Sequence, residues 1–278
     1  MKELLEPGLG SVRVFVKHDD NKARKLKYNL GHPRVLTFGG AHSNHIRAVA
    51  AAGRRHGFET IGVIRGEERL PLNPSLAYAV SRGMTLTYLD RATYRRKHTP
   101  EVLAGLRERW GDVAILPEGG SNAEAVRGCA ELPGEIAEEY DVICCPVGTG
   151  GTLAGISAGL PPGRTALGFA VLKGAGFLAD EVARLQREAY GRVWPNWSID
   201  LGYHFGGYAR STPALEAFAA GHGVEGIYVA KMLYGVLDRA RQGFFRDGAR
   251  VVAVITGLPF PLGDPDVVAG QAVTPVTS

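Results

Sequence analysis

Three short stretches of the chain carry residue types that could bind a small molecule and act on it. The first is Asn-Lys-Ala-Arg-Lys-Leu-Lys-Tyr at 21–28, where Lys22 is a candidate reactive amine. The others are polar loops at 39–45 and 148–152, and each lies between a strand-like apolar run and a helix-like run. A lysine is most often a solvated surface residue, but burial in a cleft lowers its pKa and lets it attack an aldehyde. We therefore expect a cofactor site.

The loop Gly148, Thr149, Gly150, Gly151 and Thr152 has the composition of a phosphate-binding turn. Backbone N–H groups at the start of a helix lie beside the positive end of its dipole and bind anions. Leu153 stands where a dinucleotide-binding fingerprint has its third glycine, the strand-like run 166–172 ends without a ribose-binding acid, and no Gly-Lys-Ser/Thr follows. A compact monophosphate is favoured, and a tight turn that only packs closely is the alternative.

Ser43 and Asn44 stand at the start of the helix expected over 44–56. Ser43 can cap this helix, and the same N–H groups could bind a substrate carboxylate. His42 and His45 are three positions apart, but no carboxylate or cysteine nearby completes a set of metal ligands. We expect no metal here.

Length and composition are those of an ordinary globular protein. The 278 residues, 45% of them hydrophobic, suffice for one large domain or two smaller ones. The net charge is +4, but the arginines are scattered, which argues against nucleic-acid binding. No apolar run approaches the roughly 20 residues of a membrane-spanning helix, and the first residues lack the order of a signal peptide. We expect a cytoplasmic protein without a membrane partner.

Strands alternate with helices along the chain, which predicts parallel βαβ units. Ser121 and Glu124 have the spacing of a capping box for a helix that continues past Pro133 to Tyr140. The stretch 193–208 shows no clear period, and no ordered element is expected after Phe260. The other expected helices are 23–30, 44–56, 75–82, 100–110, 153–159, 177–190 and 230–245, and the expected strands are 12–16, 35–38, 60–64, 85–89, 113–116, 142–147, 166–172 and 249–255.

Taken in order, Asn-Lys-x-Arg-Lys-Leu-x-Tyr, Gly-Gly-x-x-Ser-Asn-His and Gly-Thr-Gly-Gly-Thr resemble motifs of the 1-aminocyclopropane-1-carboxylate deaminase and D-cysteine desulfhydrase family. This family belongs to the fold type II pyridoxal-phosphate enzymes. The likeness runs from about Val12 to Thr256 and includes Pro-Glu-Gly-Gly-Ser at 117–121, Tyr-His-Phe-Gly-Gly-Tyr at 203–208 and Lys-Met-Leu-Tyr-Gly at 231–235. Several motifs in one order are far more specific than any single motif.

The resemblance implies a two-lobed α/β fold, in which each lobe is a mainly parallel sheet flanked by helices. The smaller lobe would span 31–117, and the larger, cofactor-binding lobe would combine 1–30 with 118–278. Pyridoxal 5′-phosphate would lie in the cleft, at the carboxyl ends of the strands. The resemblance also implies a homodimer.

Residue roles follow from the same resemblance. Lys22 would form a Schiff base with pyridoxal phosphate and later move the α-proton of the substrate. Asn44 would hydrogen-bond the phenolic oxygen of the cofactor, and the 148–152 loop would hold its phosphate. Ser43 would bind the substrate carboxylate and assist proton transfer.

Two further positions complete the implied site. Tyr228 would place its hydroxyl beside the cofactor ring, and Thr256 would meet the pyridine nitrogen. A neutral hydroxyl there leaves the nitrogen largely unprotonated, so the ring is a milder electron sink than one paired with a carboxylate. Such a ring suits β-elimination better than transamination.

The chain departs from the family pattern at three points. The segment 19–22 is abrupt, whereas the family has a longer segment before its lysine. Tyr-Val-Ala-Lys at 228–231 stands where the deaminases have Tyr-Glu-Gly-Lys. Ile255 and Leu258 replace a histidine and a glycine on either side of the Thr-Gly pair. Loss of the glutamate argues against ring-opening deamination of the cyclopropane substrate.

The expected function is that of a pyridoxal-phosphate-dependent lyase or deaminase that acts on a small amino acid. The reaction would be a D-cysteine-desulfhydrase-like β-elimination that gives a keto acid and ammonia. Two alternatives stay open. One is 1-aminocyclopropane-1-carboxylate deamination, and the other is a non-catalytic relative that binds pyridoxal phosphate.

Overall fold

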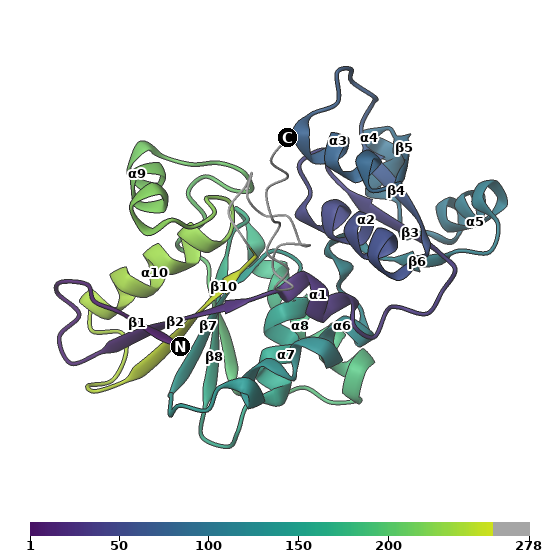
Figure 1. Ribbon diagram of the computed structural model, residues 1–278. Coiled ribbons are helices and arrows are strands. Elements are labelled where there is room, and N and C mark those ends of the chain that lie inside the picture. The colour runs from purple at the N-terminus through teal and green to yellow at the C-terminus, as the bar shows by residue number, and fades with distance from the viewer. Residues whose placement is uncertain (258–278) are drawn as a thin grey trace, which may run out of the picture. The chain divides into compact units, whose positions relative to one another are not determined.

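The computed structural model describes residues 1–257 (Figure 1). The chain divides into two compact units, of which the first combines residues 1–28 with the chain from Asn122 onward and the second spans 29–121. Leu258 and the stretch after Phe260, for which we predicted no ordered element, lie outside the described residues.

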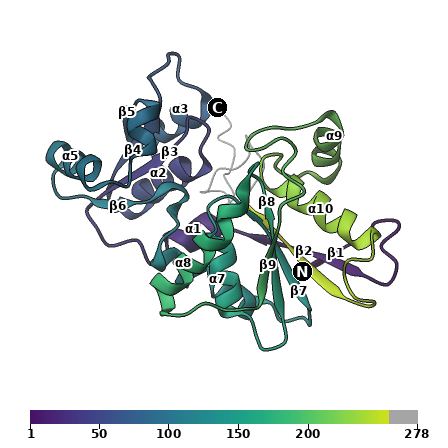
Figure 2. The same cartoon turned by 180° about the vertical axis from the view of Figure 1, so that it is seen from behind.

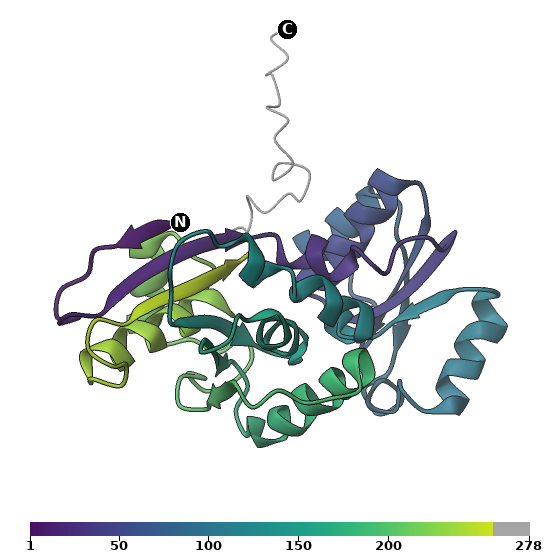
Figure 3. The ribbon, with the colours of Figure 1, turned by 90° about the horizontal axis from the view of Figure 1, so that it is seen from below.

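The first unit is built on a six-stranded sheet in the order β1-β2-β10-β7-β8-β9. All neighbouring pairs run parallel except β1, which lies antiparallel on β2. Figure 3 shows β2 and β10 side by side, although they come from opposite ends of the described chain. The strands are β1 (Lys2–Leu4), β2 (Arg13–Asp19), β7 (Val142–Val147), β8 (Thr165–Ala170), β9 (Trp197–Asp200) and β10 (Arg250–Thr256).

Helices cover both faces of this sheet. Val252 and Val254 of β10 pack into one core with α6 (Ala123–Cys129), α7 (Gly151–Gly159) and α8 (Leu178–Tyr190). The alternate residues of the same strand pack on the other face against α10 (Val229–Arg241). Because successive strand residues point to opposite faces, a strand buried on both sides is apolar throughout. Figure 2 shows α7 and α8 together on their face. Two further helices are α1 (Asn21–Leu26) and α9 (Pro213–His222).

The second unit is a four-stranded, fully parallel sheet in the order β5-β4-β3-β6. One face carries a core of Leu36, Phe38, Val63, Tyr94 and Leu106. The helices are α2 (Asn44–His56), α3 (Pro74–Ser81), α4 (Arg91–Arg95) and α5 (Pro100–Trp110), and the strands are β3 (Arg34–Gly39), β4 (Glu59–Arg65), β5 (Thr85–Leu89) and β6 (Ala114–Leu116). The predicted α/β class with mainly parallel, helix-flanked sheets is confirmed.

Two sequence predictions near residue 130 are wrong. Asn122, and not Ser121, caps α6, because its side chain accepts a hydrogen bond from the N–H of Ala125 over 2.9 Å. The helix does not continue to Tyr140 but gives way to a 3-10 turn over Leu132–Glu135, where Pro133 has no N–H to donate. We did not predict β1, α4, β9 and α9. The first three have only three to five residues, and α9 follows the stretch 193–208, which shows no clear period.

Candidate functional site

Four parallel strands of the first unit end on one row of residues. Thr256 of β10 pairs with Asp19 of β2, and Val147 of β7 pairs with Ala170 of β8. Ala253 lies beside Cys144, which places Thr256 level with Val147 three residues further along. The segments that follow these strands therefore leave the sheet at one edge, which is where open α/β sheets bind ligands.

Lys22 is the second residue of α1, directly after β2. Asp20 caps the helix by accepting a hydrogen bond from the N–H of Ala23 over 3.0 Å. Burial, followed by the positive charge of Lys25, lowers the pKa of Lys22 to about 7. The abrupt 19–22 segment is thus a strand that passes at once into a capped helix, and its lysine is partly neutral at neutral pH.

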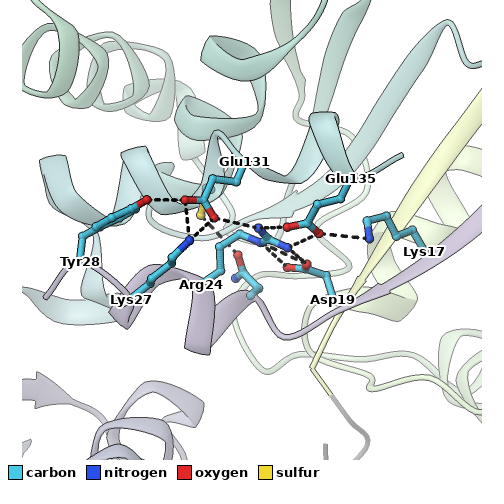
Figure 4. A network of polar contacts seen from close by, with 9 residues as sticks. Lys17, Asp19, Arg24, Lys27, Tyr28, Glu131 and Glu135 are labelled. Carbon is cyan, nitrogen blue, oxygen red and sulfur yellow. Dashed lines mark hydrogen bonds and ion pairs between the residues drawn. The ribbon is translucent and has the colours of Figure 1, made fainter. Parts of the chain in front are cut away.

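An ion-pair network fastens α1 to the rest of the unit (Figure 4). Arg24 donates to Asp19 from Nη2 over 2.6 Å and to Glu135 over 2.8 Å, and Lys17 lies 3.6 Å from Glu135. The Asp19 side chain is only 3% exposed, so its charge needs the Arg24 guanidinium. Hydrogen bonding to Arg24 in turn lowers the pKa of Glu135.

A second set of contacts lies near the end of α1. Lys27 donates to both carboxylate oxygens of Glu131 over 2.8 Å, and the hydroxyl of Tyr28 donates to the same carboxylate (Figure 4). Both networks bind the segment after α6, so the chain is held there from Arg24 to Tyr28.

A buried hydrogen bond joins the Lys22 segment to the glycine loop. The hydroxyl of Thr152 donates to Oδ1 of Asn21 over 3.0 Å, and the thiol of Cys129 donates to the same oxygen over 3.7 Å. The Thr152 hydroxyl therefore already donates its proton to Asn21, and Thr152 would bind an anion through its backbone N–H. Sequence reasoning did not single out Asn21, although it directly precedes Lys22.

The 148–152 loop fits a phosphate group. The start of α7 has no side-chain cap within the described part of the chain, so its first N–H groups are available to an anion. Gly150 has φ 80°, in the left-handed region, and a Cβ there would lie 3.0 Å from Val182. A Cβ on Gly148 would lie 3.0 Å from Cε1 of Tyr228. The glycines thus let the loop pack between α8 and the Tyr228 ring.

Tyr228 and Thr256 lie at the ends of their own elements in the first unit. The carboxylate of Glu225 accepts a hydrogen bond from the N–H of Tyr228 over 2.9 Å and fixes the start of α10. The ring of Tyr208 meets that of Tyr228 edge to face, with centroids 5.8 Å apart. Thr256 is partly buried, and the next N–H, that of Gly257, donates to the carbonyl of Asp19 over 3.1 Å.

The second unit carries Ser43 and Asn44. The Ser43 hydroxyl caps α2 by accepting from the N–H of Ile46 over 3.3 Å, and Asn44 is the first, exposed residue of that helix. A Cβ on Gly39 would lie 2.4 Å from Ile46, so the turn requires glycine. His45 is buried with Nε2 2.7 Å from the hydroxyl of Thr37. Within residues 1–257, no three His, Cys, Asp or Glu side chains are placed to hold a metal.

The structure thus assigns the candidate residues to two groups. Lys22, the 148–152 loop, Tyr228 and Thr256 belong to the first unit, and Ser43 and Asn44 belong to the second. No helix among the described residues is long and apolar enough to cross a bilayer.

Comparison with known proteins gives relatives over most of the chain. A Pyrococcus furiosus protein, provisionally named a 1-aminocyclopropane-1-carboxylate deaminase, is 31% identical over 282 positions, which cover 88% of this chain and 84% of the relative. The D-cysteine desulfhydrase of Klebsiella pneumoniae is 25% identical, over 88% of this chain and 86% of that enzyme. The crystal structure of a 1-aminocyclopropane-1-carboxylate deaminase homologue matches with a TM-score of 0.78 and 25% identity, over 92% of this chain and 88% of that one.

No protein-family model matches the sequence. The identity to the Pyrococcus protein and the extent of the match nevertheless show the relationship directly. The chain belongs to the family of 1-aminocyclopropane-1-carboxylate deaminase and D-cysteine desulfhydrase, whose cofactor is pyridoxal 5′-phosphate.

Proposed function

We propose that this protein is a pyridoxal-phosphate-dependent lyase that releases ammonia and a keto acid from a small amino acid by D-cysteine-desulfhydrase-like β-elimination. The observation that carries the proposal is the pairing of Lys22, whose pKa is lowered to about 7, with the anion-binding loop at the start of α7. The Asn21–Thr152 hydrogen bond links the two. An amine beside a phosphate-binding turn suits an aldehyde cofactor that carries a phosphate.

In this proposal each candidate residue would help to hold the cofactor or the substrate. The N–H groups at the start of α7 would bind the phosphate, Lys22 Nζ would bind the aldehyde carbon, and the Thr256 hydroxyl would meet the pyridine nitrogen. From the second unit, Asn44 would donate to the phenolic oxygen and Ser43 would bind the substrate carboxylate. The cofactor supplies an electron sink for the charge left on the α-carbon.

Lys22 is the residue that we propose moves the proton. A general base works best when its pKa lies near the working pH, and burial has lowered that of Lys22 into this range. Its neutral Nζ would accept the proton from the α-carbon. The ring of Tyr228 lies against Gly148, and its hydroxyl would hold a proton for the departing group.

Elimination is favoured over ring opening because position 229 carries no acid. Val229 and Ala230 are both fully buried, and Val229 belongs to the apolar core on the α10 face of the sheet. They cannot give or take a proton beside Tyr228. This is the physical basis for placing the chain on the desulfhydrase side of its family.

The test begins with the absorbance spectrum of the purified protein with and without pyridoxal phosphate. Borohydride reduction and peptide mapping should then place the cofactor on Lys22. Lys22→Ala should lose the label and the release of ammonia from D-cysteine, while the exposed control Lys2→Ala keeps both. Label on another lysine would refute the assignment of Lys22.

The same assay separates the alternatives. Ammonia from 1-aminocyclopropane-1-carboxylate but not from D-cysteine would favour ring opening. Bound cofactor without ammonia from either amino acid would favour the non-catalytic relative. The homodimer stays a prediction, which light scattering tests as a mass near twice 29.7 kDa.

A further inference from the structure

The proposed chemistry leaves one fully buried lysine unused. Lys231 of α10 is 0% exposed, and its Nζ donates to the carbonyl of His204 over 3.0 Å and to that of Gly207 over 2.7 Å. Burial lowers the pKa of this lysine. A buried ammonium is costly unless its donors are satisfied, and both of these partners are backbone carbonyls of one loop. The side chain therefore fixes the path of that loop.

The loop needs such an anchor because of its backbone. Phe205 and Ala209 have φ of 49° and 53°, and Gly206 and Gly207 between them have φ of 90° and 118°. Residues with a Cβ rarely adopt positive φ, and they persist there only when their surroundings hold them. Of the two carbonyls that Lys231 binds, that of His204 directly precedes this run and that of Gly207 lies within it.

One face of α10 contacts the 203–208 loop. Asp238, two turns after Lys231, accepts a hydrogen bond from the hydroxyl of Tyr203 over 2.7 Å. Between them, the ring of Tyr234 packs edge to face on Phe205, with centroids 5.2 Å apart. Positions three and four apart share a helix face. The motif at 231–235, to which the proposed reaction gives no role, thus docks the motif at 203–208.

The docked loop ends at the candidate site. Tyr208, its last aromatic residue, packs on the ring of Tyr228, and that ring lines Gly148 of the phosphate-binding loop. Tyr228 immediately precedes α10, three residues before Lys231. Lys231 therefore holds Tyr228 from two sides, through its own helix and through the loop.

We propose that Lys231 is a positioning residue, which anchors the 203–208 loop and, through Tyr208, sets the ring of Tyr228 against the phosphate-binding loop. The consequence for the cofactor rests on the proposed function, whereas the anchoring of the loop does not.

Trypsin tests the anchoring without cofactor or substrate. Arg210 is exposed and lies two residues after the end of the loop. Lys231→Met keeps the length of the side chain but removes the ammonium, and cleavage after Arg210 should become about tenfold faster or more, since charge-assisted hydrogen bonds hold the loop closed. The exposed control Lys2→Met should match the original protein. Unchanged cleavage after Arg210 in folded Lys231→Met would overturn the proposal.

The link to the site is tested with Tyr208, whose side chain is 40% exposed and tolerates replacement. By equilibrium dialysis, Tyr208→Ala should bind pyridoxal phosphate about two- to tenfold more weakly, the range for a lost aromatic pair, and Tyr208→Phe should bind normally. Adding Lys231→Met to Tyr208→Ala should cause little further loss. Additive losses, or normal binding by Tyr208→Ala, would show that Lys231 does not act through this ring.

The trypsin and binding experiments distinguish a failure of this inference from a failure of the proposed function. If the original protein binds no pyridoxal phosphate, the proposed function fails, and the rate of cleavage after Arg210 still decides whether Lys231 anchors the loop. If Lys231→Met does not fold, the comparison of Tyr208→Ala with Tyr208→Phe still decides the contact with Tyr228.

Discussion

The hydroxyl of Thr152 donates a hydrogen bond to Oδ1 of Asn21, 131 positions earlier in the chain, over 3.0 Å. Both side chains are buried, at 7% and 8% exposure. Thr152 lies in the first turn of α7 and Asn21 in the first turn of α1, next to Lys22. This bond therefore joins the 148–152 loop to the segment that carries Lys22.

Replacing Thr152 by valine should weaken binding of pyridoxal phosphate by roughly five- to tenfold. The shape of the side chain is kept, but Asn21 loses a buried donor, at a cost of about 1–1.5 kcal/mol. Thr152→Ser should restore binding, and the exposed Thr165→Val should have no effect. Titration by absorbance gives the affinities. Tight binding by Thr152→Val would show that the bond does not couple the two segments.

The reactivity of Lys22 should follow its lowered pKa. Only the neutral amine attacks an aldehyde, so the rate of adduct formation with pyridoxal phosphate should rise with pH to a plateau, with a midpoint near 7. An ordinary lysine would have its midpoint near 10.5. Stopped-flow absorbance measures the rate, and Lys22→Ala subtracts the other lysines. A midpoint above about 9, close to that of a free lysine, would contradict the burial of Lys22.

The same shift makes stability depend on pH. The unfolded chain keeps the Lys22 proton up to about pH 10.5, whereas the folded protein releases it near 7. The unfolded state therefore binds more protons in this window, and the contribution of Lys22 to the free energy of unfolding rises with pH across it. Chemical denaturation across the window should show a smaller upward slope for Lys22→Met than for the original protein. Equal slopes would contradict the shift.

Arg24 and Arg13 each bind a carboxylate through Nε and Nη2 but differ in burial. Arg24 and Asp19 have side chains 11% and 3% exposed, whereas Arg13 and Glu3 are 51% and 31% exposed. Arg24→Met should lower the free energy of unfolding by about 3–5 kcal/mol, because Asp19 is left charged and buried. Arg13→Met should cost far less, because an exposed ion pair contributes little to stability. Similar losses in urea denaturation would mean that burial does not set the difference.

Replacing two helical glycines by alanine should change the free energy of unfolding in opposite directions. A Cβ on Gly155 of α7 would lie 2.3 Å from Cβ of Cys129 and 2.5 Å from the carbonyl of Val126, so Gly155→Ala must push α7 away from α6. We expect it to lower the free energy of unfolding by about 1–3 kcal/mol. Gly221 of α9 has open space, and Gly221→Ala should raise it by about 0.5–1 kcal/mol. Thermal and urea unfolding compare the variants. A neutral Gly155→Ala would show that the two helices separate easily.

Local patterns were sufficient to predict most of the framework. The helix at 44–56 and the strand at 142–147 match the predicted bounds. Hydrophobic periodicity, helix caps and the glycines that end helices depend on residues close together in the sequence, so they can be recognised from it. The Lys22 stretch and the 148–152 loop stood out for the same reason, as each joins a strand to a helix. Where two neighbouring residues could cap one helix, as at 121 and 122, sequence pattern chose wrongly.

Only the tertiary structure decided which distant groups meet. The sequence presents Lys22 as one lysine among many, and burial together with the nearby charge of Lys25 gives it a pKa of about 7. Neither the Asn21–Thr152 bond nor the carbonyl partners of Lys231 follow from spacing, since their members lie 131, 27 and 24 residues apart. Such contacts depend on strand order and helix packing, and desolvation acts on a group only after the chain has closed around it.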